Sequence, residues 1–178
     1  MKLSPREFDP TDRAILELLQ EDCKQPLATI GGKVGLSAPA VVERIHKLEE
    51  AGVVTSYVAL LDARKLGMDV AAFIAVKADS QRVQGPLESR LGALEEVLEC
   101  HHVTGAHSFL LKVRTRNMEA LENLIDRIRA LEGITHTETH IVLSTYAEGP
   151  RLPLAGSPEF RARSSRRSAS QRARRSST

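Results

Sequence analysis

The sequence predicts an α+β fold, with an N-terminal winged helix-turn-helix followed by a ferredoxin-like βαββαβ domain. Two observations support this class. Before residue 51, apolar residues recur at helical spacing in three short segments, and a β-branched stretch follows them. From residue 70 the pattern changes to four strand-like segments and two amphipathic helices, in the order strand, helix, strand, strand, helix, strand. We therefore expect domains at residues 1–62 and 63–149, followed by a disordered basic tail at residues 150–178.

The first helix is expected to begin after Asp9, whose side chain can cap it. Pro10 suits the first helical position because an N–H there has no partner within the helix. Pro26 ends the helix, since a proline disfavours helical geometry in the residue before it. The apolar stripe of this helix comprises Ile15, Leu16, Leu18 and Leu19.

Residues 27–34 form a short predicted helix, with Leu27, Ile30 and Val34 directed inward. In a helix-turn-helix two helices pack closely at a steep angle, which requires a small residue at the approach and a glycine in the turn. Gly31 and Gly35 occupy those positions. Because Gly31 and Gly32 each lower helix propensity by about 1 kcal/mol relative to alanine, this helix should depend on tertiary packing.

A third helix is expected from the capping residue Ser37 to Gly52, with Pro39 inside its first turn. Its buried face comprises Val41, Ile45 and Leu48. Residues 53–61 are rich in β-branched and apolar side chains, and this composition predicts a strand, the wing. An ordinary three-helix bundle without DNA contact is the alternative interpretation of this half.

The second half contains predicted strands at residues 70–78, 97–104, 109–115 and 134–145. A helix is expected at residues 86–95, with Leu87, Leu91 and Leu94 directed inward. The second helix is capped by Asn117, ends at Gly133 and directs Leu121, Leu124, Ile125, Ile128 and Leu131 to one side. This order gives an antiparallel sheet with two helices on one face, and we expect a second subunit to cover the other.

The formal net charge of +2 conceals an uneven distribution. Residues 1–150 hold 17 basic and 22 acidic side chains, whereas residues 151–178 hold eight arginines and one acid. No apolar stretch approaches the roughly 18–20 residues of a membrane span, and the first residues lack the apolar centre of a secretion signal. Two separated cysteines, Cys23 and Cys100, indicate reduced thiols, so we expect a cytoplasmic protein. With no tryptophan and 3% aromatic residues, a base-stacking nucleic-acid platform is disfavoured.

Several motifs resemble those of the Lrp/AsnC (leucine-responsive/asparagine regulator) family of transcription factors. Residues 8–16, FDPTDRAIL, are similar to the family's LDxxDxxIL opening. Its helix-turn-helix is resembled by residues 34–37, 42–45, 48–49 and 52–54. Residues 99–105 and 109–113 resemble the strand-turn-strand of its effector-binding domain.

The resemblance extends over residues 7–147 and implies a DNA-binding transcriptional regulator with a C-terminal RAM-type domain. It implies binding to double-stranded DNA, assembly into homodimers or octamers, and a small-molecule effector held between subunits. The final strand, with Thr137, Thr139 and Ile141, also fits the family pattern. The resemblance implies neither a cofactor nor catalytic residues.

The turn after Gly105 departs from the family pattern. Family members usually have Asp-aromatic-Asp there, whereas this chain has Ala106, His107 and Ser108. An acidic group in the turn would pair with the ammonium group of an amino acid, and its loss removes about 1–3 kcal/mol if the pair is buried. The class of effector therefore stays open, with amino acids among the candidates.

The resemblance places the recognition helix in the major groove, where its first two turns contact bases and phosphates. Arg44 and Lys47 have the reach for guanine edges or phosphates, but a structural role for Glu43 and Arg44 is the alternative. The predicted DNA-binding residues are Ser37, Ala40, Glu43, Arg44, His46 and Lys47. The predicted effector-binding residues are His102, Thr104, Gly105, Ala106, His107, Ser108, Thr137 and Thr139.

Histidines are concentrated in the predicted sheet domain. Five of the six lie there, beside Cys100: His101, His102, His107, His136 and His140. Imidazole and thiolate are ligands for zinc, copper or nickel, so a metal-sensing regulator is one alternative function. Histidine titration near neutral pH is a second possible switch. A siroheme-decarboxylase-like enzyme is a third alternative, although no paired acid–base or nucleophile arrangement supports it.

The basic tail has no counterpart in the family pattern. Its arginines are interspersed with serine and alanine, a composition typical of disordered polycations. Two interpretations stay open: salt-dependent, non-specific affinity for DNA, or an extension without function.

Overall fold

The computed structural model describes residues 9–79 and 86–154, which form two compact units. Among the described residues, the first unit contains residues 9–59 and 149–154, and the second contains residues 60–79 and 86–148. The chain therefore leaves the first unit once and returns to it. The expected domain boundaries at residues 62 and 149 stay predictions, and residues 155–178 of the expected disordered tail lie outside the described residues.

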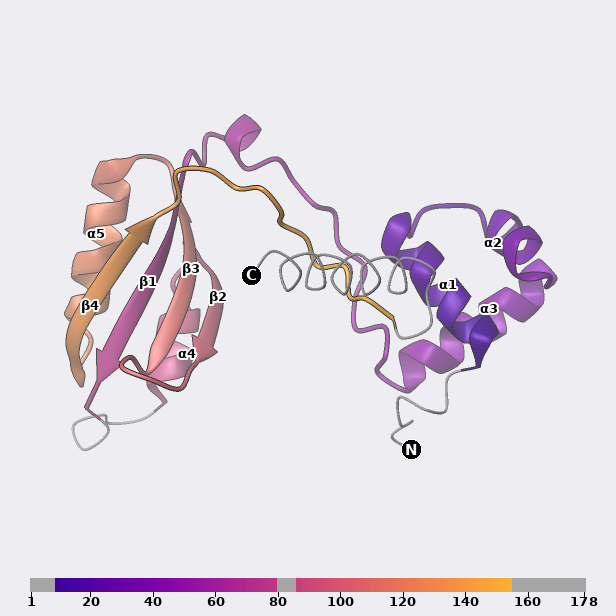
Figure 1. Cartoon of the computed structure of the whole chain (residues 1–178), viewed down its shortest axis with the longest axis horizontal. Coiled ribbons are helices and arrows are strands. Elements are labelled where there is room, and N and C mark those ends of the chain that lie inside the picture. The colour runs from indigo at the N-terminus through magenta and orange to yellow at the C-terminus, as the bar shows by residue number, and fades with distance from the viewer. Residues whose placement is uncertain (1–8, 80–85, 155–178) are drawn as a thin grey trace, which may run out of the picture. The chain divides into compact units, whose positions relative to one another are not determined.

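The first unit is helical and the second is a sheet with two helices (Figure 1). A single 3₁₀ turn precedes the sheet. The elements are α1 (Pro10–Glu21), α2 (Leu27–Val34), α3 (Ala38–Glu50), η1 (Arg64–Leu66), β1 (Val70–Ala78), α4 (Leu87–Gly92), β2 (Val97–His102), β3 (Phe109–Thr115), α5 (Met118–Arg129) and β4 (Ile134–Ile141). No helix within the described residues has the length and apolarity needed to cross a membrane.

Side-chain caps begin two helices of the first unit at the predicted residues. The Asp12 N–H donates to Asp9 Oδ1 at 2.7 Å, and the Ala40 N–H donates to Ser37 Oγ at 3.4 Å. Gly35 ends α2 with a φ of 71°, a left-handed conformation that glycine adopts at little cost. The core of the unit comprises Ile15, Leu16, Ile30, Val41 and Leu48.

The strand expected at residues 53–61 is absent, so the described chain has a helix-turn-helix without a wing strand. The reason is the lack of a pairing partner, because the only described sheet uses β1 to β4. The apolar side chains of this segment stay exposed, with Val58, Leu60 and Leu61 each at least two-thirds accessible. Tyr57 is held by its hydroxyl, which donates to Glu49 Oε1 at 2.7 Å.

The second unit is an antiparallel sheet in the order β2-β3-β1-β4, the predicted ferredoxin-like arrangement. Both helices cover one face, where Ile74 and Leu111 lie opposite each other in neighbouring strands. The core on this face comprises Ala72, Ile74, Val76, Leu87, Leu91, Phe109, Leu111, Val113, Leu121, Leu124 and Ile128.

Several predicted elements are longer than the observed ones, among them α1, which ends at Glu21, and α5, which ends at Arg129. The helix expected at residues 86–95 ends at Gly92, a poor helix former. The strand expected at 97–104 ends at His102, because the Val103 N–H bonds to the Ser108 carbonyl and closes the turn. The strand expected at 134–145 ends at Ile141, because its partner β1 begins at Val70 and offers one further bond, from Val142 N–H to the Ala71 carbonyl.

The other face of the sheet is not covered by a helix within the described residues, and we call it the open face. In β1 it presents Ala71, Phe73 and Ala75, since these alternate with the core residues. Phe73 lies between Lys112 of β3 and His140 of β4, and its side chain is 37% exposed.

Candidate DNA-binding and effector sites

Helices α2 and α3 approach most closely at Gly31. A Cβ atom on Gly31 would lie 2.4 Å from the backbone oxygen of Leu36, closer than a real carbon–oxygen contact allows. The Gly31 carbonyl also accepts a hydrogen bond from the Leu36 N–H at 2.9 Å. Gly31 therefore sets the position of α3 against α2, as its place in the sequence predicted.

Helix α3 has a buried side and an outward face. Val41 and Leu48 are buried, whereas Pro39, Val42, Glu43, His46 and Lys47 are exposed. These five residues recur three to four positions apart, so they follow one side of the helix. Lys47 Nζ donates to Glu43 Oε1 at 2.6 Å, which lowers the pKa of Glu43. We call these five residues the outward face of α3.

Arg44 does not belong to the outward face. Its Nη1 lies 2.6 Å from Asp9 Oδ2 and 2.6 Å from Asp12 Oδ1, both at the start of α1. Asp12 and then Asp9 raise the pKa of Arg44 through these hydrogen bonds. The arginine therefore ties α3 to α1, which corresponds to the structural alternative considered for this residue.

Substituting Arg44 with methionine is expected to lower the free energy of unfolding at neutral pH by about 1–2 kcal/mol, because two carboxylates lose their common partner. The pKa of Asp9 is lowered, first by the Asp12 N–H and then by Arg44. This stabilisation is present above the ordinary value of 3.8 and is lost as the pH falls through the lowered value. Urea unfolding at several pH values should therefore show the difference from wild type shrinking in acid.

Lys47→Met is the matched control for this series, since it also removes a cation from α3 but breaks only an exposed pair with Glu43. Its stability should stay close to wild type at every pH. Equal stability of the Arg44→Met variant and wild type at neutral pH would show that the arginine is not a structural residue.

The turn between β2 and β3 carries most of the predicted effector residues. Thr104, Gly105 and Ala106 are exposed, and Gly105 has a φ of 116°. Ser108 is fixed in the sheet: its N–H donates to the Val76 carbonyl, and its Oγ accepts from the Ala78 N–H at 3.2 Å. The exposed part of the turn thus stands on a rigid base.

The predicted effector residues do not all come together. The Oγ1 of Thr137 accepts a hydrogen bond from Arg129 Nε at 2.9 Å, and its side chain is buried on the face covered by α5. Thr139 lies on the same face, opposite Ile74. His102 also belongs to this face, where its ring contacts Phe109 with centroids 5.2 Å apart.

Glu138 is a residue of this region that the sequence did not single out. Its Oε2 lies 3.4 Å from His107 Nε2 in the turn, and its Oε1 lies 3.4 Å from His140 Nε2. The open face therefore has a carboxylate beside the turn, although the turn itself lacks one. The signal in the sequence was the alternation of β4, which places His136, Glu138 and His140 on the same side.

The histidines and Cys100 are divided between the two faces of the sheet. Cys100 is opposite Leu111 of the core face, and burial raises the pKa of its thiol. His101 Nε2 lies 3.0 Å from Glu99 Oε2, and the other oxygen of the Glu99 carboxylate binds Lys112. No group of three or more ligand side chains suited to a metal ion forms among residues 9–79 and 86–154.

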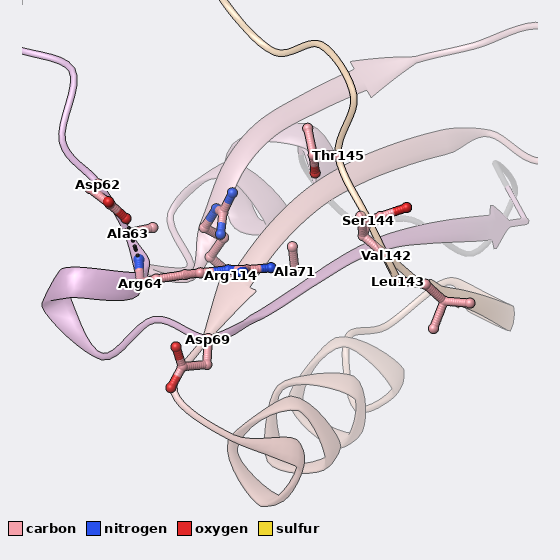
Figure 2. A pocket seen from close by; sticks show the side chains of 10 residues that line it. All are labelled: Asp62, Ala63, Arg64, Asp69, Ala71, Arg114, Val142, Leu143, Ser144 and Thr145. Carbon is pink, nitrogen blue, oxygen red and sulfur yellow. Dashed lines mark hydrogen bonds between the residues drawn. The ribbon is translucent and has the colours of Figure 1, made fainter.

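A cavity of about 270 Å³ lies at the opposite end of β3 from the turn (Figure 2). Arg64 of η1 and Arg114 of β3 line it together with acidic and hydroxyl side chains, and none of the predicted effector residues does. Its lining comprises Asp62, Ala63, Arg64, Asp69, Ala71, Arg114, Val142, Leu143, Ser144 and Thr145.

Two family models match the chain. The AsnC-type helix-turn-helix domain matches residues 8–49, and the Lrp/AsnC ligand binding domain matches residues 71–152. The chain belongs to the Lrp/AsnC family. It is a DNA-binding transcriptional regulator of the Lrp/AsnC type, as the sequence motifs predicted.

Relatives of this Lrp/AsnC regulator match it over both units. The HTH-type transcriptional regulator FL11 of Pyrococcus horikoshii is 37% identical over 147 residues, covering 83% of this chain and 97% of that protein. The structure of AsnC from E. coli is 30% identical with a TM-score of 0.74, covering 82% of this chain and 99% of that one. A feast or famine regulatory protein from M. tuberculosis, solved in complex with L-methionine, is 32% identical with a TM-score of 0.76, covering 81% and 97%.

Proposed function

We propose that this Lrp/AsnC regulator reads duplex DNA with the outward face of α3. The observation that carries the proposal is that Arg44 of this helix is bound to α1, whereas the residues of the outward face are exposed to solvent. Arg44 is held by two carboxylates of α1, whereas Pro39, Val42 and His46 have exposed side chains. Lys47 and Glu43 are paired with each other on the surface, and both can exchange that pair for contacts with DNA.

Each outward residue has a chemistry that suits the major groove. An apolar side chain such as Val42 can pack on the methyl group of thymine. His46 and Lys47 can donate to base acceptors or phosphates, and Glu43 can accept from cytosine. Ser37 and Ala40, at the first turn of α3, complete the proposed contact surface. Arg44 is a positioning residue in this account.

Selection of duplexes from a random pool by repeated binding to the full chain tests this proposal. We expect the pool to converge on a motif with two related halves, separated by about one helical turn of 10 base pairs. The affinity for that motif should exceed the affinity for a scrambled duplex by at least about 1,000-fold. A pool that shows no enrichment over many rounds would contradict sequence-specific binding.

We further propose that the open face of the sheet associates with a second copy of the chain. Phe73 is partly exposed at the centre of this face, beside the small residues Ala71 and Ala75. Charged groups surround this apolar centre: Lys112 lies 2.6 Å from Glu148, and Arg114 lies 3.3 Å from the same carboxylate. An apolar centre with a polar rim is the usual anatomy of a protein interface. Dimers and octamers both remain compatible with it.

Phe73→Asp is expected to raise the dissociation constant of the assembly by at least about 100-fold, because a carboxylate would replace an aromatic side chain at the centre of the interface. Sedimentation equilibrium measures this change directly. Met118→Asp is the matched control, since it places the same charge at an exposed apolar position of α5, away from the open face. An unchanged mass distribution for Phe73→Asp would contradict the proposed interface.

We infer that the turn at residues 104–108 holds a small effector with help from Glu138. The exposed backbone N–H groups near Gly105 suit a carboxylate, and the Glu138 carboxylate suits an ammonium group. An α-amino acid carries both groups, and the M. tuberculosis relative was solved with L-methionine. In this role the protein acts as a regulator in the cytoplasm rather than as an enzyme.

L-methionine is therefore expected to stabilise the protein in a thermal unfolding experiment, by about 2.7 kcal/mol at 100 times its dissociation constant. Glu138→Gln should weaken this effect at least about tenfold, because it removes the proposed partner of the ammonium group. Glu122→Gln, at an exposed position of α5, is the matched control and should respond like wild type. Full stabilisation of the Glu138→Gln variant would contradict the role of this carboxylate.

A further inference from the structure

The cavity at the end of β3 lies where the chain enters and leaves the second unit. Residues 62–69 lead into β1, and residues 142–145 follow β4. Between these segments are Ala71 of β1 and Arg114 of β3, which are paired across the sheet. Figure 2 shows the two segments on opposite sides of the cavity. At about 270 Å³ the cavity is slightly smaller than the roughly 300–1,000 Å³ of sites for drug-sized ligands, so its size suits a small metabolite.

Arg114 brings a guanidinium group that is only partly neutralised. Its side chain is 18% exposed, and Nη2 donates to Glu148 Oε2 at 3.3 Å, the only hydrogen bond of this guanidinium within the described residues. The other oxygen of Glu148 is closer to Lys112 Nζ, at 2.6 Å, and this lysine is the main cause of the lowered pKa of Glu148. Arg114 therefore shares its carboxylate with a second cation and has further N–H groups available for an anion.

Arg64 of η1 brings a second guanidinium group to the same cavity (Figure 2). Within residues 9–79 and 86–154 this guanidinium has no hydrogen bond and no ion pair. The backbone that carries it is fixed, because Asp62 Oδ1 accepts from the N–H groups of Arg64 at 3.1 Å and of Lys65 at 3.4 Å. Two guanidinium groups from separate elements thus line one cavity, a combination that favours carboxylate or phosphate groups.

Asp69 determines what else the ligand must carry. It lines the cavity, and in the described part of the chain its carboxylate has no hydrogen bond or ion pair. Asp62, the other acidic residue of the lining, is already bound to two N–H groups of η1. An ionised carboxylate only accepts hydrogen bonds, so the ligand group beside Asp69 must be a donor. A hydroxyl group donates without adding a positive charge near the two arginines, whereas an ammonium group would add one.

We propose that this cavity binds a small hydroxycarboxylate, with its carboxylate groups at Arg64 and Arg114 and its hydroxyl group at Asp69. The site is separate from the turn at residues 104–108, because its lining shares no residue with that turn. It is therefore a second ligand site, with residues and a ligand class different from those of the effector site proposed above. Both segments at which the chain enters and leaves the second unit contribute to the lining, so a bound ligand holds both against the sheet.

Isothermal titration calorimetry with L-malate tests the proposal on the full chain. Wild type is compared with Arg64→Met and with Lys65→Met, which removes the same charge from the next residue of η1 but from a side chain outside the cavity lining. Arg64 is changed rather than Arg114 because Arg64 is not part of the polar rim proposed for the open face, so assembly should stay as in wild type. Succinate, L-aspartate and inorganic phosphate are titrated in parallel.

L-malate should bind wild type and Lys65→Met with equal affinity. Arg64→Met should bind it at least about tenfold more weakly, because a charged hydrogen-bond partner is lost. Wild type should also prefer L-malate to succinate, which lacks the hydroxyl group. Asp69→Ala should remove this preference without weakening the binding of succinate. A lower affinity of Asp69→Ala for both compounds alike would indicate a merely structural role and overturn the place of Asp69 in the site.

Amide hydrogen exchange of wild type in the presence of L-malate locates the site without any substitution. Residues 62–64 and 142–145 should exchange more slowly, whereas residues 104–108 should exchange as before. No binding of L-malate, protection confined to the turn, or equal weakening by Arg64→Met and Lys65→Met would each overturn the proposal. Phosphate or L-aspartate binding as tightly as L-malate would overturn the choice of a hydroxycarboxylate.

Discussion

Replacing Gly31 with alanine is expected to destabilise the helix-turn-helix by about 2–3 kcal/mol, one of the largest effects of a single methyl group in this chain. The added Cβ would lie 2.4 Å from the Leu36 backbone oxygen. A backbone atom cannot swing aside as a side chain does, so α2 and α3 must separate. The separation also strains the 2.9 Å hydrogen bond from Leu36 N–H to the Gly31 carbonyl. The gain in helix propensity, about 1 kcal/mol, offsets only part of this cost.

Gly32→Ala is the matched control, because the neighbouring glycine lies in the same helix with no atom within 4 Å of an added Cβ. It should stabilise the protein by about 0.5–1 kcal/mol, since alanine is the better helix former. Urea unfolding followed by circular dichroism, together with amide exchange in α2, measures both variants. Two variants of equal stability would show that the helices do not meet at Gly31.

The elements that depend on local chemistry were predictable from the sequence. Asp9, Ser37 and Asn117 each carry a side-chain oxygen at the position where a helix lacks a backbone partner, and each caps its helix as expected. Strands β1 and β3 also have the expected bounds, because both are central strands with continuous partners. The capping residues and the alternation of buried residues are therefore sufficient to predict where these helices begin and where these strands lie.

The elements that depend on a distant partner were not predictable. The strand expected at residues 53–61 has the composition of a strand but no neighbour within the described chain. The end of β4 at Ile141 is set by the start of β1 at Val70, 71 residues earlier in the sequence. Leu152 and Leu154 were expected to belong to a disordered tail, because arginines dominate the composition that follows them. In the structure Leu152 pairs with Gln20 of α1, and Leu154 packs against the core of the first unit.

In the candidate site, too, the features set by local sequence were predictable and those set by distant residues were not. Ser37, Glu43, His46 and Lys47 lie at exposed positions of α3 or at its cap, as helical periodicity predicts. The fixed position of Arg44 depends on two carboxylates more than 30 residues away, which only the tertiary structure reveals. The placement of Glu138 beside His107 likewise depends on the pairing of β4 with β1.

Val42→Asp is expected to lower the affinity for the selected duplex by about 100-fold, or about 2.8 kcal/mol. Val42 is an exposed apolar residue, 48% accessible, at the middle of the outward face of α3. The substitution removes the proposed contact with a thymine methyl group and places a negative charge against the phosphates. Stability should change little, because valine and aspartate have similar helix propensities and the position is exposed.

Met118→Asp provides the matched control for this variant. It also replaces an exposed apolar side chain, 53% accessible, with aspartate, but it lies at the start of α5 in the second unit. Both variants therefore change the net charge of the protein by the same amount. A general electrostatic effect on DNA binding would appear in both, whereas an effect of the α3 surface would appear only in Val42→Asp.

The decisive measurement is the ratio of affinities for the selected and the scrambled duplex. It is made for wild type, Val42→Asp and Met118→Asp at one salt concentration. If the outward face of α3 reads the DNA sequence, the ratio falls by at least about tenfold for Val42→Asp and stays at the wild-type value for Met118→Asp. An unchanged ratio for a folded Val42→Asp protein would contradict the claim that the outward face of α3 reads the DNA sequence.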